Sequence, residues 1–306
     1  MVFQEESATS WLWPLARSFS GKEAYGSSRS SSSLSEPDDD PERRDRERAF
    51  DIADSVEKGL AREVVGEFTH PLRRSSKLWR FHVVRSEDKL QYRLFSDDGE
   101  FLMYARANLD AHRVDFFLYN PTEKEARLYD PTRPAFTMSF SKDRTEWRIA
   151  QERCDHCQFQ PKHLTCACHG KQQVAYIRQS RKPIGDGIFN CMEVHIPGLY
   201  NDGSRVIWCP MLGMGDLAGP HEDYDAQTLC TKQPAWNDEV ESLVLDFKGR
   251  NIQSSAKNFQ LALSQKPEHV ICQYGKIGPM TFSLDFKYPL SVIQAFGISL
   301  TTLFWT

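Results

Sequence analysis

The densest group of residues able to do chemistry lies between positions 154 and 169. Cysteine and histidine side chains gather there: Cys154, His156, Cys157, His163, Cys166, Cys168 and His169. Structural zinc sites take four thiolate or imidazole ligands, and a Cys-x-x-Cys pair supplies half of many such sites. Cys154 and Cys157 form such a pair, and Cys166 with Cys168 would complete a zinc site. The alternative is a loop of reduced surface thiols, because the second pair is spaced Cys-x-Cys and the loop is short.

The rest of the chain carries no pattern typical of a catalytic centre. It lacks the GxSxG, P-loop, HExxH and GxGxxG motifs. His195, His221 and His269 have no partner visible in the sequence, and an isolated histidine is usually a surface or core residue. The basic stretch 178–182 is short and has no interleaved aromatic residues. We therefore expect neither an enzyme nor a nucleic-acid-binding protein.

A short apolar segment runs from Pro289 to Trp305. A helix that is hydrophobic on every side is either buried in a core or spans a membrane. A span needs about 20 apolar residues, and Gln294 and Thr301 interrupt this shorter run. Pro289 suits the first turn of a helix. The pattern therefore favours a helix buried inside the protein.

Segments with alternating hydrophobic residues precede this helix. They occupy 78–86, 90–96, 101–107, 114–120, 243–247, 259–263, 270–274 and 282–286. Asp97-Asp98-Gly99 is a hairpin turn signal, and further turn signals lie at 248–251 and 275–279. Period-two alternation between turns is typical of half-buried antiparallel strands. Many such strands around one apolar helix predict a mainly β (α+β) fold, in which a closed barrel leaves no exposed edge.

Composition limits the class of protein. The 306 residues carry a net charge of −4 and a mean hydropathy of −0.55, so any basic binding site must be local. The N-terminus lacks the positive region and apolar core of a secretory signal. Eight cysteines without such a signal are typical of reduced thiols in an intracellular protein.

The chain divides into three parts. Residues 1–48 are rich in serine and charge, which predicts a disordered arm. Its cluster from Trp11 to Leu15 is either incidental or a docking motif for a membrane or partner. Residues 49–68 have apolar side chains at every fourth position, which predicts an amphipathic helix that packs on the barrel or binds a partner. The barrel domain is expected over 77–306.

The C-terminal part resembles the C-terminal domain of the tubby-like proteins. The matching stretches are LVLDFKGR (243–250), SSAKNFQL (254–261), PEHVICQYGKIG (267–278) and TFSLDFKYPLSVIQAFGISL (281–300). A weaker similarity covers 173–210 and extends upstream to about residue 78. The resemblance implies a closed antiparallel barrel of about 12 strands around one central hydrophobic C-terminal helix.

The resemblance also implies a binding site. Tubby-like domains bind phosphatidylinositol bisphosphate in the inner leaflet through basic side chains on the early strands, where guanidinium forks suit phosphate oxygens. The corresponding residues here are Arg106 and Arg113. A further arginine of the family falls near Ser139, where Lys142 and Arg144 are close enough in sequence to substitute for it.

Two functions follow from this interpretation. The first is a membrane-tethered adaptor or regulatory protein, cytoplasmic and peripheral at the plasma membrane, with nuclear or ciliary roles also implied by the resemblance. It would bind phosphatidylinositol 4,5-bisphosphate or a related lipid, and a protein partner or cargo through its N-terminal arm. Charge reversal at Arg106 and Arg113 would abolish its salt-sensitive vesicle binding. The second is a protein-interaction module of the same fold without lipid binding, with zinc as its only expected cofactor.

Overall fold

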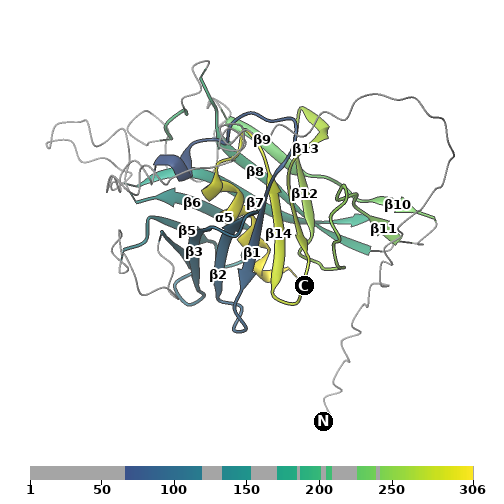
Figure 1. Cartoon of the computed structure of the whole chain (residues 1–306), viewed down its shortest axis with the longest axis horizontal. Helices are drawn as coiled ribbons and strands as arrows, with labels where there is room; N and C mark the ends of the chain where they lie inside the picture. The colour runs from purple at the N-terminus through teal and green to yellow at the C-terminus, as the bar shows by residue number, and fades with distance from the viewer. Residues whose placement is uncertain are drawn as a thin grey trace, which may run out of the picture.

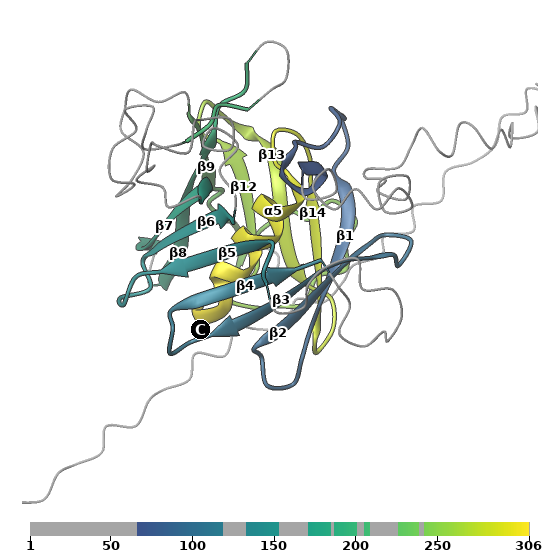
Figure 2. The ribbon, with the colours of Figure 1, turned by 90° about the vertical axis from the view of Figure 1, so that its left-hand side faces the viewer.

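The computed structural model shows twelve strands of the described residues closed into one barrel around a C-terminal helix (Figures 1 and 2). The structure describes residues 66–118, 133–152, 171–184, 187–200, 205–208, 226–238 and 242–305. The barrel strands are β1 (Trp79–Arg85), β2 (Gln91–Ser96), β3 (Phe101–Asn108), β4 (Arg113–Phe117), β5 (Phe136–Phe140), β6 (Glu146–Gln151), β7 (Gln172–Ile184), β8 (Gly187–Pro197), β9 (Ala226–Thr231), β12 (Phe259–Leu263), β13 (Lys266–Lys276) and β14 (Thr281–Phe286). Their order is β1-β14-β13-β12-β9-β8-β7-β6-β5-β4-β3-β2, and β2 pairs with β1 to close the barrel. This confirms the predicted fold.

Alternation along the strands decides which side chains line the barrel. In β6, Trp147 and Ile149 are fully buried, whereas Glu146 and Arg148 between them are partly exposed. Strands β1 to β4 confirm the four early strands predicted from the same pattern. The turn between β2 and β3 is the predicted one, and Gly99 adopts a φ of 90° that favours glycine.

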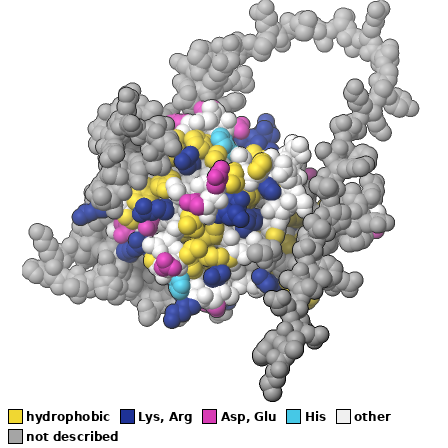
Figure 3. Space-filling view, turned by 90° about the horizontal axis from the view of Figure 1, so that it is seen from below, with side chains coloured by type: hydrophobic (Ala, Val, Ile, Leu, Met, Phe, Trp, Pro, Cys, Tyr) yellow, Lys and Arg dark blue, Asp and Glu magenta, His cyan; other side chains and the backbone are white. Residues whose placement is uncertain are grey.

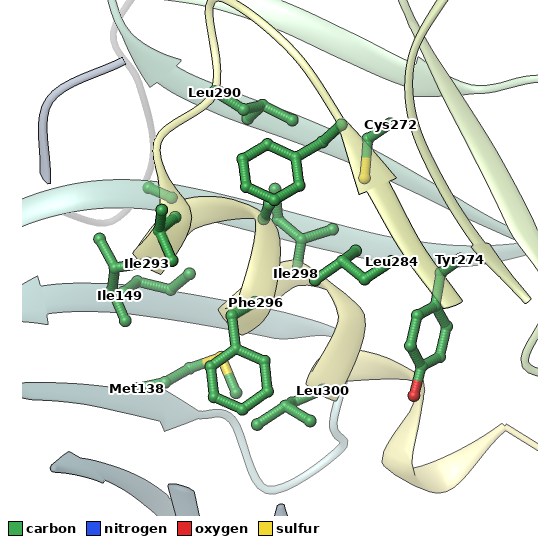
Figure 4. Packing of buried hydrophobic residues seen from close by; sticks show 14 of the residues in the cluster. Met138, Ile149, Cys272, Tyr274, Leu284, Leu290, Ile293, Phe296, Ile298 and Leu300 are labelled. Carbon is green, nitrogen blue, oxygen red and sulfur yellow. The ribbon is translucent and has the colours of Figure 1, made fainter. Parts of the chain in front are cut away.

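The apolar C-terminal segment is a buried helix, as predicted. Helix α5 (Val292–Leu300) begins with a capping box between Ser291 and Gln294, and a 3₁₀ turn, η2 (Thr301–Phe304), follows it. Every residue of α5 is buried, and in Figure 4 Phe296 lies beside Met138 while Ile293 lies beside Ile149. Gln294 Nε2 donates to the carbonyl of Val174 at 2.8 Å, so this polar side chain is satisfied inside the barrel. No helix within the described residues has the length and apolar character of a membrane span.

A strap, defined here as residues 245–258, lies outside the barrel over β12 to β14. It follows a small hairpin of β10 (Ala235–Asn237) and β11 (Ser242–Val244). The strand predicted over 243–247 is therefore only partly present, because the chain leaves the extended pairing after Val244 and turns at Lys248-Gly249, both with positive φ. Hydrogen bonds join the strap to the strands: Gln260 Nε2 of β12, for example, donates to the carbonyl of Asp246 in the strap at 2.7 Å.

Two predicted parts of the chain lie largely outside the described residues. The arm at 1–48 lies wholly outside them. Of the helix predicted over 49–68, only residues 66–68 are described, and these are helical.

Candidate functional site

Arg106 lies on the outer face of β3. Its neighbours Ala105 and Ala107 point into the barrel and are buried, whereas Arg106 is exposed. Its guanidinium lies 5.6 Å from the centre of the Phe117 ring, a cation–π contact that holds it against the strand surface. In register it faces Asp115 of β4.

Arg113 begins β4 and lies on the same outer face. Its Nε is 2.7 Å from one carboxylate oxygen of Asp115, and its Nη2 donates to the other at 3.1 Å. The Arg113 side chain is 46% exposed, whereas that of Asp115 is 6% exposed. Asp115 therefore orients Arg113 from beneath and leaves part of its guanidinium open to solvent.

A third arginine, which the sequence interpretation missed, completes a row. Arg113 lies opposite Ser139 of β5, and Ser139 lies opposite Arg148 of β6. With strands spaced about 4.8 Å apart, the backbones at Arg113 and Arg148 are roughly 10 Å apart on one face. Arg148 thus supplies a cation beside Ser139, the position at which the resemblance implied an arginine. We call Arg106, Arg113 and Arg148 the arginine row.

Lys142 and Arg144 lie beyond the strand ends rather than in this row. Both belong to the turn between β5 and β6 and are exposed. The guanidinium of Arg144 lies 4.1 Å from the centre of the Phe304 ring, next to the end of the central helix. These two residues therefore extend the basic surface toward one end of the barrel.

The arginine row has only a small net positive charge. Asp115 pairs with Arg113, and Glu146 lies 3.1 Å from Arg148, so three cations face two anions. Charges of both signs also intermix with hydrophobic side chains on the face of the molecule seen from below (Figure 3). A polyanion would therefore be recognised by local guanidinium forks and not by a broad field.

The same outer face continues to His195 on β8. Tyr176 of β7 lies opposite both Arg148 and His195. His195 is held by Glu193, 2.7 Å from Nε2, and by Thr228, 3.1 Å from Nδ1. Burial lowers the pKa of His195, although Glu193 opposes this effect, and both ring nitrogens have hydrogen-bond partners, so the ring is a satisfied histidine of the sheet.

The predicted zinc ligands Cys154, Cys157, Cys166 and Cys168 lie outside the described residues. Within the described residues, no group of three or more His, Cys, Asp or Glu side chains is arranged to hold a metal ion. The described cysteines, Cys191, Cys230 and Cys272, are free thiols.

A cleft of about 750 Å³ lies away from the arginine row. It is lined by the chain from Arg73 to Phe81 and by the turn between β2 and β3. Its lining includes four basic residues, Arg73, Arg74, Lys77 and Arg80, and three acidic ones, Asp97, Asp98 and Glu100. The acidic side chains offset most of the positive charge of this cleft, as Asp115 and Glu146 do in the arginine row.

Comparison with known proteins decides the family. The sequence model of the Tub family matches residues 68–304, more than half of the chain. The chain belongs to the Tub family. It is 32% identical over 149 residues to tubby-related protein 3 of Homo sapiens, covering 48% of this chain and 34% of that protein. It is 34% identical over 150 residues to tubby protein homolog 1 of Caenorhabditis elegans, covering 46% and 35% of the two chains.

Insect relatives match a shorter stretch. The chain is 38% identical over 117 residues to protein king tubby of Anopheles gambiae, covering 36% of this chain and 26% of that protein. The Tub family chain thus spans about a third or less of the length of these relatives. These matches support a tubby-like regulatory protein.

Proposed function

We propose that this protein binds a phosphoinositide headgroup through its arginine row and acts as a membrane-tethered, non-enzymatic adaptor. The observation that carries the proposal is the placement of Arg106, Arg113 and Arg148 on one outer face of neighbouring strands. Two or more guanidinium forks at such spacing can each donate paired hydrogen bonds to separate phosphates. Lys142 and Arg144 would add attraction to an anionic leaflet.

The cellular setting follows from this chemistry. Phosphatidylinositol 4,5-bisphosphate or a related lipid would hold the protein at the cytoplasmic face of the plasma membrane. A protein partner or cargo would bind the N-terminal arm. Nuclear or ciliary roles would follow release from that membrane or transport with cargo.

The acidic partners in the row favour a second candidate. Because Asp115 and Glu146 offset two of the three arginines, the row keeps a net charge of only about one. A protein-interaction module without lipid binding would fit such a face. Its Cys154, Cys157, Cys166 and Cys168 loop would then hold one zinc ion, which metal analysis of the purified protein would detect.

Co-sedimentation with vesicles tests the first candidate. We expect the full chain to pellet with vesicles containing phosphatidylinositol 4,5-bisphosphate, and less so at high salt. Arg106→Glu with Arg148→Glu should weaken binding at least about tenfold, since each basic residue near an anionic surface contributes about 1 kcal/mol. Arg113 is left intact because it neutralises the nearly buried Asp115.

The matched control reverses two charges at the far end of the barrel. Lys171 and Lys266 are exposed and lie at the starts of β7 and β13, the strand ends opposite the β5–β6 turn. Lys171→Glu with Lys266→Glu changes the net charge equally and should retain binding. If the two double variants lose binding equally, the row is not a site. If the wild-type chain does not pellet, the second candidate gains support.

A further inference from the structure

Strands β7 and β8 extend beyond the barrel wall as a two-stranded ribbon. The last pairing of β7 with β6 joins Arg178 to Glu146, and the pairing of β8 with β9 begins at Glu193. Between these points, residues 180–184 and 187–191 pair only with each other in the described part of the chain. In Figure 1 the two strands run on to the right-hand side of the molecule. We call residues 180–184 and 187–191 the ribbon.

The end of the ribbon combines exposed apolar side chains with cations. Ile188 is 70% exposed, the most of any large hydrophobic side chain among the described residues. Pro183 lies opposite it and is also exposed, and Phe189 beside it is half-buried. Arg181 and Lys182 are exposed in the adjacent pairs. The sequence from 180 to 191 contains two basic residues and one acidic residue, Asp186, so its net charge is positive.

The ribbon emerges at the end of the barrel where the arginine row and its neighbouring turns lie. The amide of Gln179 donates to the carbonyl of Thr145 at 2.7 Å, which joins the base of the ribbon to the β5–β6 turn. The amide of Phe140 donates to the carbonyl of His112 at 3.0 Å, which joins that turn region to the β3–β4 turn. The β3–β4 turn carries Leu109, 40% exposed. Two of the three exposed large hydrophobic side chains in the described residues therefore project at one end.

Exposed apolar tips beside Lys and Arg match the chemistry of a lipid interface. Apolar side chains enter the boundary between headgroups and acyl chains, while long basic side chains keep their charges at the level of anionic headgroups. Exposure of the Ile188 side chain to water does not stabilise the protein, whereas transfer of this side chain from water to acyl chains is favourable. A protein partner would need a groove complementary to this narrow ribbon. The pattern of exposed apolar and basic side chains does not point to such a partner.

We propose that the ribbon is a second membrane contact, in which Ile188 inserts into the lipid interface while Arg181 and Lys182 lie at anionic headgroups. Leu109 is the corresponding apolar contact on the β3–β4 turn. This inference rests on the proposed membrane binding and adds an orientation to it. The ribbon end of the barrel faces the bilayer, with the arginine row beside the leaflet surface.

The test combines a partitioning measurement with a local probe. Ile188→Ser should lower partitioning of the full chain onto vesicles of phosphatidylcholine, phosphatidylserine and phosphatidylinositol 4,5-bisphosphate by about tenfold, since an isoleucine side chain is lost from the acyl boundary. Tyr200 is 55% exposed and follows the opposite end of β8, so Tyr200→Ser is the matched control and should bind normally. Unchanged thermal unfolding of both variants would show that they fold.

An environment-sensitive fluorescent amino acid at position 188 or 200 reports insertion directly. With brominated acyl chains, we expect quenching at position 188 and none at position 200. If the chain pellets, depends on Arg106 and Arg148, and yet tolerates Ile188→Ser without quenching at 188, the ribbon inference is wrong while the proposed function stands. If the wild-type chain binds no vesicles, both fail.

Discussion

The thiol of Cys272 makes the stability of the barrel depend on pH at the scale of one residue. It is fully buried, and burial raises its pKa well above the ordinary value. In the unfolded chain a cysteine ionises near pH 8.5. The folded state then binds more protons than the unfolded state above that pH. The contribution of Cys272 is therefore fully present below about pH 8.5 and is lost at about 1.4 kcal/mol per pH unit above it.

Urea unfolding between pH 7 and 10, under reducing conditions, measures this loss. Above pH 8.5, the unfolding free energy of Cys272→Ala should fall less steeply with pH than that of the wild-type chain. The two slopes should differ by about 1.4 kcal/mol per pH unit, which corresponds to one proton. Leu261 lies opposite Cys272 and is also fully buried, so Leu261→Ala should lower stability equally at every pH. Burial lowers the pKa of Lys257 to about 8, which contributes with the opposite sign, so the comparison is made between variants. If the unfolding free energy of Cys272→Ala falls with pH as steeply as that of the wild-type chain, Cys272 is not the cause of the pH dependence.

The arginine row shows what sequence reasoning about single residues could and could not find. Arg106 and Arg113 were predicted from the resemblance and lie on the expected strands. Arg148 was missed because no strand was predicted over 146–151, and because a strand pattern does not show which residue lies opposite across strands. The short turn at 141–145 was the available signal, since a tight hairpin there pairs Ser139 with Arg148.

At the scale of elements, α5 packs directly against the barrel wall at Gly297. A β-carbon there would lie 2.4 Å from Cδ1 and 3.2 Å from Cγ1 of Ile149. Alanine adds up to about 1 kcal/mol of helix propensity, whereas overpacking a core costs about 1–3 kcal/mol. We therefore expect Gly297→Ala to lower the free energy of urea unfolding by about 1 kcal/mol.

A substitution at Ile149 tests whether its close contact with position 297 causes this loss of stability. Ile149→Val removes the Cδ1 methyl group and alone should cost about 0.5–1.5 kcal/mol. In that background, Gly297→Ala should be neutral or stabilising, because the closest contact is gone and the helix propensity remains. Additive effects in the double variant would show that the two residues do not compete for space.

Elements were predicted best where their pattern is local. The apolar run of α5 and the alternation of β1 to β4 and β12 to β14 decide their own structure. The segment after Val244 also alternates, yet it folds back as the strap. Its course depends on Asp285, a charged strand residue whose side chain is only 3% exposed. A local pattern does not reveal that distant residues cover one strand.

At the scale of the whole molecule, the strap seals the outer face of the strands that complete the barrel. Arg250 of the strap donates from Nε to Asp285 of β14 at 2.9 Å and forms a second bond from Nη2. Gln273 of β13 donates to the same carboxylate at 2.9 Å, and Gln260 of β12 bonds Gln273 at 3.3 Å. One buried polar network thus joins the strap to three consecutive strands, next to the β1–β14 pairing.

Removing one partner of this network should destabilise the whole barrel. Arg250→Met leaves the Asp285 carboxylate buried without its cation, which costs about 3–5 kcal/mol. Combining Arg250→Met with Asp285→Asn removes the buried unpaired carboxylate, and the asparagine oxygen can still accept a hydrogen bond from Gln273. Most of the lost unfolding free energy should therefore return. Urea denaturation measures both. A loss below about 1 kcal/mol in Arg250→Met would mean that the strap does not hold the strands. Because the strap lies away from the arginine row, the double variant should also keep the vesicle affinity of the wild-type chain.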